Sequence, residues 1–212
     1  MLISHSKKFI FIHNYKVAGT SIRYALRKYE FYSRSNANLL NKALLSLNIY
    51  PKIFSSEFSG HIKASELKKL LPISVFETYF KFGFVRNPWD WQVSLYTFIL
   101  KDKTHFQHEL IKNMKNFDDY IEWRAENFEL QKDFFYDKNN VCLVDFIGKL
   151  RNIDKDFKYI SDKLGISGHL PHLRKSRYDN NFLKYYNRNT SNIVAEVFKE
   201  DIETFGYDIP DI

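Results

Sequence analysis

The segment Phe9–Leu26, FIFIHNYKVAGTSIRYAL, constrains the fold of this chain more than any other. A short apolar run ends in a turn that carries Lys16, Gly19, Thr20 and Ser21, and a helix-like sequence follows at once. In the order strand, loop, helix, the first backbone N–H groups of the helix have no partner within it and point at a bound anion. Glycine lets the backbone approach that anion closely, while hydroxyl and ammonium groups add donors. The segment therefore predicts a phosphate or sulfate ester as ligand.

The position of the lysine distinguishes this loop from a Walker A loop, in which the lysine directly precedes the Ser or Thr. Here Lys16 lies three residues before Gly19. The order KxxGTS resembles the 5′-phosphosulfate loop of the sulfotransferases that use 3′-phosphoadenosine 5′-phosphosulfate (PAPS). Taken alone, the segment equally fits an ordinary strand–helix turn with a helix N-cap. The resemblance implies that the donor is bound by Lys16, Val17, Ala18, Gly19, Thr20 and Ser21.

A second strand-to-helix junction follows the aromatic run at 79–85, YFKFGFV. Asn87 is a good N-cap and Pro88 a good first helical residue, so Arg86 is expected at the carboxyl end of a strand beside a helix N-terminus. Ser94 lies further along the same predicted helix. A guanidinium near a hydroxyl and a helix end suits a phosphate monoester.

The string FGFVRNPWDWQVSLY resembles the 3′-phosphate-binding segment of the same family, commonly written RNPxxRxxS. Arg86, Asn87, Pro88 and Ser94 match, whereas Trp91 stands where the family commonly has a second arginine. The departure removes one positive charge and puts the hold on the 3′-phosphate in doubt. Later segments, in about 141–165 and 170–209, resemble the late strand, closing loop and terminal helix of the carbohydrate-type (family 2) sulfotransferases.

The pattern of apolar and turn residues predicts an α/β fold with few strands and many helices. It is a P-loop-like three-layer fold, in which a small central parallel sheet is surrounded by helices and ligands lie at the carboxyl ends of the strands. The length predicts a single domain over residues 1–212. Strands are expected at 8–13, 79–85 and 141–146, and helices at 20–30, 38–48, 64–71, 88–101, 117–127, 153–164 and 191–205.

Sulfuryl transfer to a hydroxyl needs a group that stabilises the departing oxygen and a base that takes the hydroxyl proton. We expect Lys16 to take the first role and His61, just before a predicted helix, to take the second. An imidazole that is neutral near pH 7 suits proton removal, although a histidine here also fits a plain helix cap. Glu57 is the rival base, because some family members use a carboxylate, and His13 is a third candidate that is expected to pack at the strand end.

The basic loop around Arg174 and Lys175 is expected to close over the cofactor's phosphates, or else to be a solvated loop. The resemblance implies PAPS as donor, adenosine 3′,5′-bisphosphate (PAP) as product, no metal, and a small-molecule or glycan acceptor. A carbohydrate is the expected acceptor. The spacing of the residues does not identify which one, and the sequence does not indicate the oligomeric state.

Charge and composition leave two other function classes to weigh. The formal net charge of +7 suits a polyanionic cofactor and would suit nucleic acid, but the basic residues are spread along the chain, so no nucleic-acid partner is expected. A P-loop-type nucleotide kinase and a non-catalytic polyanion-binding module remain as alternatives. No apolar run is long enough for a transmembrane helix, no signal peptide is apparent, and Cys142 is the only cysteine, expected to be a packing residue. These features predict a cytoplasmic enzyme.

Overall fold

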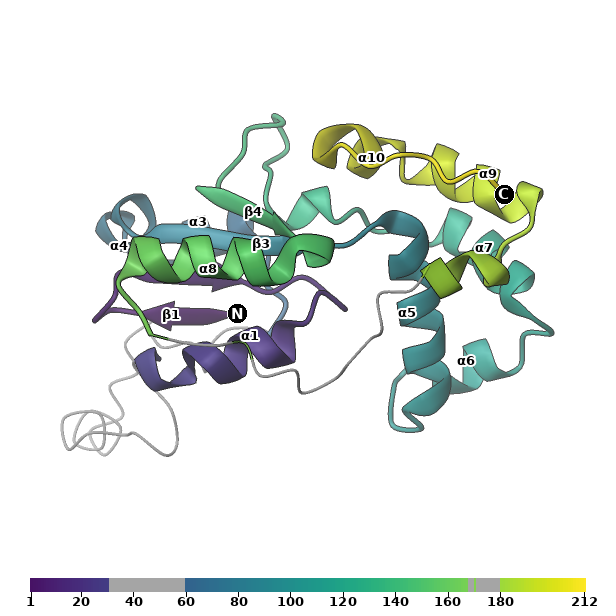
Figure 1. Ribbon diagram of the computed structural model, residues 1–212, viewed down its shortest axis with the longest axis horizontal. Coiled ribbons are helices and arrows are strands. Elements are labelled where there is room, and N and C mark those ends of the chain that lie inside the picture. Colours follow the sequence, from purple (N-terminus) through teal and green to yellow (C-terminus); the bar gives the residue numbers. More distant parts are fainter. Residues whose placement is uncertain (31–59, 168–169, 171–179) are drawn as a thin grey trace. The chain divides into compact units, whose positions relative to one another are not determined.

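The computed structural model describes residues 1–30, 60–167, 170 and 180–212, and all structural statements below concern these residues (Figure 1). The chain divides into two compact units. An α/β unit comprises Met1–Val85 and Asp133–Lys175, and a helical unit comprises Arg86–Lys132 and Ser176–Ile212. The single domain predicted over 1–212 stays a prediction.

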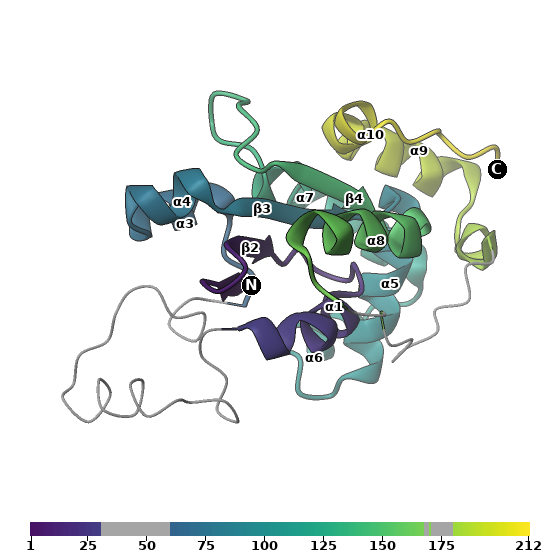
Figure 2. The same cartoon turned by 60° about the vertical axis from the view of Figure 1, so that its left-hand side comes forward.

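The α/β unit is built on a four-stranded sheet in the order β1-β2-β3-β4 (Figure 2). The strands are β1 (Leu2–Ser4), β2 (Phe9–Ile12), β3 (Phe80–Val85) and β4 (Phe146–Lys149). β3 pairs in parallel with both β2 and β4, whereas β1 pairs with β2 in the antiparallel direction. The expected parallel core is confirmed, and β1 extends it as an edge strand that the sequence pattern does not predict.

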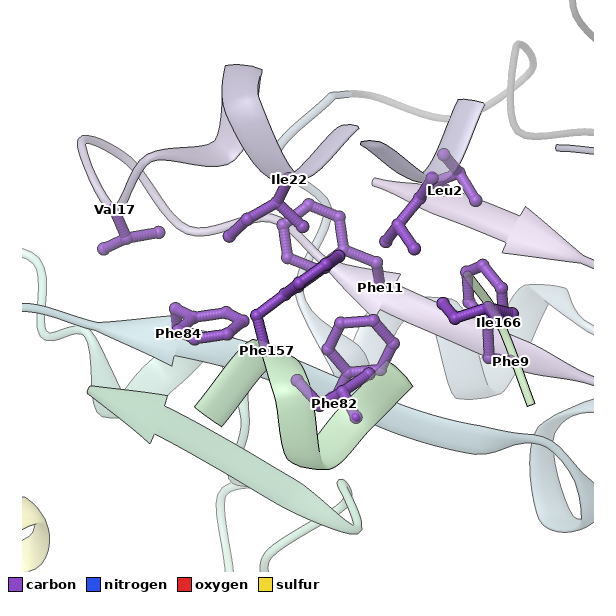
Figure 3. Packing of buried hydrophobic residues seen from close by; sticks show 11 residues of the cluster. Leu2, Phe9, Phe11, Val17, Ile22, Phe82, Phe84, Phe157 and Ile166 are labelled. Atoms are coloured by element: carbon purple, nitrogen blue, oxygen red, sulfur yellow. The ribbon is translucent and has the colours of Figure 1, made fainter. Parts of the chain in front are cut away.

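One face of the sheet carries the main core. Because side chains alternate along a strand, Phe9 and Phe11 of β2 share a face with Phe82 and Phe84 of β3. That face packs against α1 (Gly19–Leu26) and α8 (Ile153–Leu164), and Figure 3 shows Phe157 of α8 lying among the phenylalanines of the strands. The complete burial of each phenylalanine side chain adds about 1.5–3 kcal/mol to the free energy of unfolding. This packing holds α1, and therefore the predicted phosphate loop before it, against the sheet.

The opposite face of the sheet meets α4 (Ile73–Thr78), which follows α3 (Ala64–Leu70), and the turn after η3 (Lys132–Phe134). The Lys81 Nζ lies 5.4 Å from the centre of the Phe76 ring of α4. The Phe135 ring lies against Gly83 so closely that a Cβ there would come within 2.2 Å of Phe135 Cε1. Helices and turns on both sides of the sheet give the α/β unit the expected three layers.

The helical unit contains α5 (Pro88–Lys101), α6 (His108–Lys112), α7 (Phe117–Glu126), η5 (Asn180–Tyr185), α9 (Arg188–Val197) and α10 (Lys199–Phe205). α5 begins as the sequence predicts. The Asn87 Oδ1 accepts hydrogen bonds from the backbone N–H of Trp89 (3.1 Å) and of Asp90 (3.3 Å), and Pro88 is the first helical residue. The remaining short elements are η1 (Arg27–Tyr29) and η4 (Leu150–Asn152), both in the α/β unit.

Several predicted elements need correction. The strand expected at 141–146 is wrong, because β4 begins only at Phe146. Cys142 instead bridges to Tyr136 and is exposed, so it is not a packing residue. The helix expected at 191–205 is two helices, α9 and α10, which meet at Phe198. α4 and α6 are not predicted by the sequence pattern, and the helix expected at 38–48 lies outside the described residues.

Candidate active site

The predicted phosphate loop joins the end of β2 to the start of α1. Two of its non-glycine residues adopt left-handed backbone angles, Lys16 (φ 57°) and Ala18 (φ 59°). Residues in this conformation help to turn successive backbone N–H groups toward one point, which makes an anion-binding concavity. The first hydrogen bond of α1 runs from the Ile22 N–H to the Ala18 carbonyl at 3.1 Å. The N–H groups at the very start of α1 therefore have no intrahelical partner, as anion binding requires.

The exposure of the loop residues agrees with that arrangement. Val17 is completely buried in the core cluster and anchors the loop. Lys16, Ala18 and Ser21 are half-buried, and Thr20 is exposed. The loop thus keeps one apolar contact with the core and leaves its polar side chains within reach of a ligand.

Gly19 meets a constraint that sequence reasoning missed. A Cβ at this position would lie 1.6 Å from Nε2 of His13, so the imidazole of His13 occupies the space in which a side chain would stand. The pKa of His13 is lowered to about 2, first by burial and then by electrostatic interaction with the Met1 amino group, His61 and Arg23. His13 is therefore neutral near pH 7 and is a poor proton acceptor.

His61 lies at the centre of a column of aromatic rings. The His13 and His61 ring centres are 4.4 Å apart, and Tyr15 stacks on His61 at 4.1 Å. Phe11 continues the column beyond His13 at 5.6 Å, and Phe134 meets Tyr15 edge-on at 5.4 Å. All these rings belong to the α/β unit. The structure therefore brings the predicted base beside residues of the predicted phosphate loop.

A hydrogen bond determines the tautomer of His61. Its Nδ1 lies 2.9 Å from the backbone carbonyl oxygen of His13. A carbonyl oxygen only accepts, so Nδ1 must carry the hydrogen. In the neutral ring the lone pair is then on Nε2, the atom that can take a proton. This geometry suits a general base.

The predicted 3′-phosphate segment lies in the helical unit, at the start of α5. The Arg86 guanidinium donates from Nε to Oδ2 of Asp90 (2.6 Å) and from Nη2 to Oδ1 (2.7 Å), and the residue is buried. The Arg86 backbone N–H donates to Oε1 of Gln131 (2.9 Å), whose Nε2 donates back to the Arg86 carbonyl (2.8 Å). Ser94 is half-buried further along α5.

Asp90 and Gln131 are site neighbours that sequence reasoning missed. Asp90 had a signal, because acidic residues are favoured in the first turn of a helix, and Asp90 is in the first turn of the helix predicted to begin at Pro88. Gln131 had none, since it is distant from Arg86 in the chain. The Gln131 and Lys132 backbone N–H groups in turn donate to the buried Asp201 of α10, at 2.9 and 2.8 Å. Three segments of the helical unit thus fix the backbone at Arg86.

The tryptophans of α5 are packing residues. Trp91, where the family commonly has arginine, is 1% exposed and meets Phe198 edge-on at 6.0 Å. Trp89 is fully buried, and its Nε1–H donates to Oγ of Ser191 at 3.0 Å. Neither offers a face to a nucleotide or a sugar. Glu57, Arg174 and Lys175 lie outside the described residues.

Two negative findings concern the described part of the chain. No group of three or more His, Cys, Asp or Glu side chains gathers there in a way that could hold a metal ion. None of its helices is long and apolar enough to cross a membrane.

Comparisons with known proteins agree with the motifs. The sequence pattern of the group described as "Sulfotransferase family" matches residues 1–208. A crystal structure of mouse sulfotransferase SULT7A1 complexed with PAP has a similar fold, with a TM-score of 0.53 at 15% sequence identity. That likeness covers 94% of this chain and 85% of the mouse chain. A search of curated proteins finds no match. Because the family pattern spans nearly all of the sequence and both compact units, the chain belongs to the sulfotransferase family, whose members use PAPS as donor.

Proposed function

We propose that this enzyme transfers the sulfuryl group of PAPS to a hydroxyl of a carbohydrate acceptor by in-line displacement. The observation that carries the proposal is the position of His61. Its ring lies against His13 and Tyr15, which precede Lys16 of the predicted phosphate loop, and its Nδ1–H is held by the His13 carbonyl. A proton acceptor beside an anion-binding loop is the minimum that transfer of an anionic group to a hydroxyl requires.

The residues act in one concerted displacement. Nε2 of His61 takes the proton of the acceptor hydroxyl, and that oxygen forms a bond to sulfur. The bond between sulfur and the bridging oxygen breaks, and its electron pair stays on the 5′-phosphate of the departing PAP. The Lys16 ammonium and the N–H groups at the start of α1 stabilise the charge that develops there. No covalent enzyme intermediate and no metal is needed in this scheme, because the donor is already activated.

The remaining predicted residues hold the donor. Arg86 and Ser94 bind the 3′-phosphate, helped by Arg174 and Lys175, whose charges offset the absence of an arginine at Trp91. The Arg86 side chain is held in one orientation before the donor binds, because Asp90 holds its guanidinium and Gln131 holds its backbone. A planar guanidinium recognises a phosphate through paired hydrogen bonds.

Nucleotide binding tests the donor assignment. Isothermal titration calorimetry with PAP and with AMP, which lacks the 3′-phosphate, should show tighter binding of PAP. Arg86→Ala should remove that preference, whereas Arg27→Ala, at an exposed position of η1, should keep it. Magnesium ATP bound more tightly than PAP would favour the kinase alternative. Steeply salt-dependent binding without a 3′-phosphate preference would favour a polyanion-binding module.

Turnover with labelled PAPS and a panel of glycans, lipids and small alcohols tests the base and the acceptor. His61→Ala should keep PAP affinity and lose about 10²–10⁴-fold in turnover. His105→Ala, a histidine outside the ring column, is the matched control. Unchanged turnover in His61→Ala would remove His61 from the mechanism and make Glu57 the base to test. Transfer to lipids or alcohols but to no glycan would refute the carbohydrate assignment.

A further inference from the structure

We propose that Tyr15 is a positioning residue for the base, holding the face of its ring against His61 and stabilising the imidazolium that forms during transfer. The inference rests on the proposed function, because it gives Tyr15 a part in the step in which His61 takes a proton. It adds a residue that is outside both phosphate motifs. Tyr15 stands directly before Lys16, so the same short loop would carry the residue that supports the base and the residue that stabilises the leaving group.

The geometry of the stack is the first support. The Tyr15 and His61 ring centres are 4.1 Å apart with an angle of 29° between the planes, which is a stacked arrangement. Tyr15 is itself braced by Phe134, whose ring meets it at 86° and 5.4 Å. Phe134 is completely buried, so it cannot move aside without disturbing the core. Tyr15 is thereby held in the orientation that covers one face of the imidazole.

A second ring that packs against His61 stays neutral. His13 lies 4.4 Å away, and burial lowers its pKa to about 2. His13 therefore does not compete for the proton that His61 takes. Its carbonyl holds Nδ1–H in both protonation states of His61, so gaining a proton at Nε2 does not break the anchor.

The surroundings of His61 explain why an aromatic face is useful here. Lys63, two residues after His61, lies 5.9 Å from the centre of the Phe134 ring and is paired with Asp133 at 3.7 Å. Arg23, one of the charges that act on His13, is paired with Glu30 at 3.4 Å. His61 itself is half-buried against the rings of His13 and Tyr15, and removal of an imidazole from water disfavours its charged form.

The π-face of tyrosine opposes that effect. Its negative quadrupole attracts a cation placed over the ring, by about 0.5–1 kcal/mol at exposed sites and about 2 kcal/mol when the pair is desolvated. The neutral His61 gains much less from the same contact. Tyr15 thus favours the protonated state that the displacement step generates, which is the condition for a group to accelerate that step.

Two substitutions separate stacking from the rest of the side chain. Tyr15→Phe keeps the ring and removes the hydroxyl, whereas Tyr15→Leu removes the aromatic face and keeps an apolar side chain. We expect Tyr15→Leu to lower kcat about 3-fold to 30-fold with the KM for PAPS changed less than about 2-fold, and Tyr15→Phe to keep kcat within about 2-fold. Far-ultraviolet circular dichroism checks that both variants fold.

A second readout does not depend on turnover. Long-range ¹H–¹⁵N correlation spectra of the imidazole give the tautomer of His61 and the midpoint of its titration. In Tyr15→Leu that midpoint, and with it the acidic limb of the kcat–pH profile, should move to lower pH, because the charged ring has lost its support. Tyr15→Phe should titrate like the wild type.

The outcomes are distinct. A wild type that transfers sulfate, with Tyr15→Leu equal to it in kcat and in the His61 titration, overturns the inference and leaves the proposed function intact. A wild type that transfers no sulfate to any acceptor removes the proposed function, and the positioning role falls with it. A loss in Tyr15→Leu that Tyr15→Phe shares in full would assign the effect to the hydroxyl and also overturn the inference.

Discussion

Replacing Gly19 by alanine should disturb the site through a single steric contact. The new methyl would lie 1.6 Å from Nε2 and 2.1 Å from Cδ2 of His13, which is closer than a Cβ atom approaches other heavy atoms in folded proteins. The His13 ring must therefore move. Its room is limited, because Phe11 stacks on it at 5.6 Å and His61 lies at 4.4 Å on another side.

The expected cost follows from two opposing effects. Overpacking a well-filled site costs typically about 1–3 kcal/mol. Alanine in a helix is favoured over glycine by roughly 0.5–1 kcal/mol, and Gly19 is the first residue of α1. Gly19→Ala should therefore lower the free energy of unfolding by about 1–2 kcal/mol, which is a fall of several degrees in Tm for a chain of this size.

Gly60→Ala is the matched control, because a Cβ there meets no atom of the described residues within 4 Å although the residue adjoins His61. Urea unfolding should show this variant unchanged or slightly stabilised. The His61 titration by NMR should move only in Gly19→Ala, since His61 is bonded to the His13 carbonyl. If Gly19→Ala matches Gly60→Ala in both measurements, the argument that His13 links the loop to His61 is refuted.

Three further predictions concern pH, the helical unit and Trp91. The pKa of His13 is about 2 in the folded protein and near 6.5 in the unfolded chain, so the unfolded chain binds more protons between these values and stability falls as pH drops below about 6.5. His13→Asn should flatten that fall in urea midpoints measured from pH 7.5 to 5, and equal slopes would contradict the assignment. Asp201→Ala should cost about 2–4 kcal/mol in urea unfolding, because two backbone N–H groups lose a buried carboxylate. Glu203→Ala, whose side chain is 65% exposed, should stay within about 0.5 kcal/mol of the wild type, and equal losses would exclude the buried carboxylate as the cause. Trp91→Arg, which restores the residue common in the family, should lower stability by roughly 3–5 kcal/mol in thermal unfolding, because the site is apolar and 1% exposed. A Trp91→Arg protein that is as stable as the wild type and binds PAP more tightly would contradict this expected loss of stability.

Local signals account for what the sequence predicts well. The start of α5 follows from Asn87 and Pro88, and α8 spans the predicted residues and is capped at its end by Gly165 in the left-handed conformation. These boundaries depend on residues within one turn of the helix end, so no tertiary information is needed. The strand, turn and helix of the predicted phosphate loop belong to the same class, because they are contiguous in the sequence.

Tertiary contacts decide what the sequence does not predict. The apolar run at 141–146 has the composition of a strand, yet only Phe146 enters β4, and the preceding residues form the exposed bridge between Tyr136 and Cys142. The apolar pattern at 191–205 fits one helix and does not indicate that the helix is interrupted at Phe198, which is buried against Trp91. Composition favours an element in each case, and packing against distant residues sets where it begins and ends.

The same distinction applies to the candidate site. Lys16, Gly19 and Arg86 stand in motifs, so reading the sequence is enough to propose them as site residues. The contact between His13 and His61 joins residues 48 positions apart, and no spacing rule predicts it. Sequence reasoning chose His61 from its neighbours in the chain, whereas the structure shows which nitrogen carries the proton and which rings enclose it.

Of the two predicted phosphate-binding segments, the one for the 3′-phosphate depends more on positive charge from other parts of the chain. Arg86 is neutralised in place by Asp90 through two short hydrogen bonds, and the position at which the family commonly adds a second arginine holds a core tryptophan. The segment at the start of α5 therefore brings no net positive charge to a phosphate dianion, although it brings a rigidly oriented guanidinium and a helix N-terminus. Orientation and charge are supplied separately in such an arrangement. In the proposed function the fixed guanidinium recognises the geometry of the phosphate, and the attraction comes from basic residues elsewhere, which is the part proposed for Arg174 and Lys175.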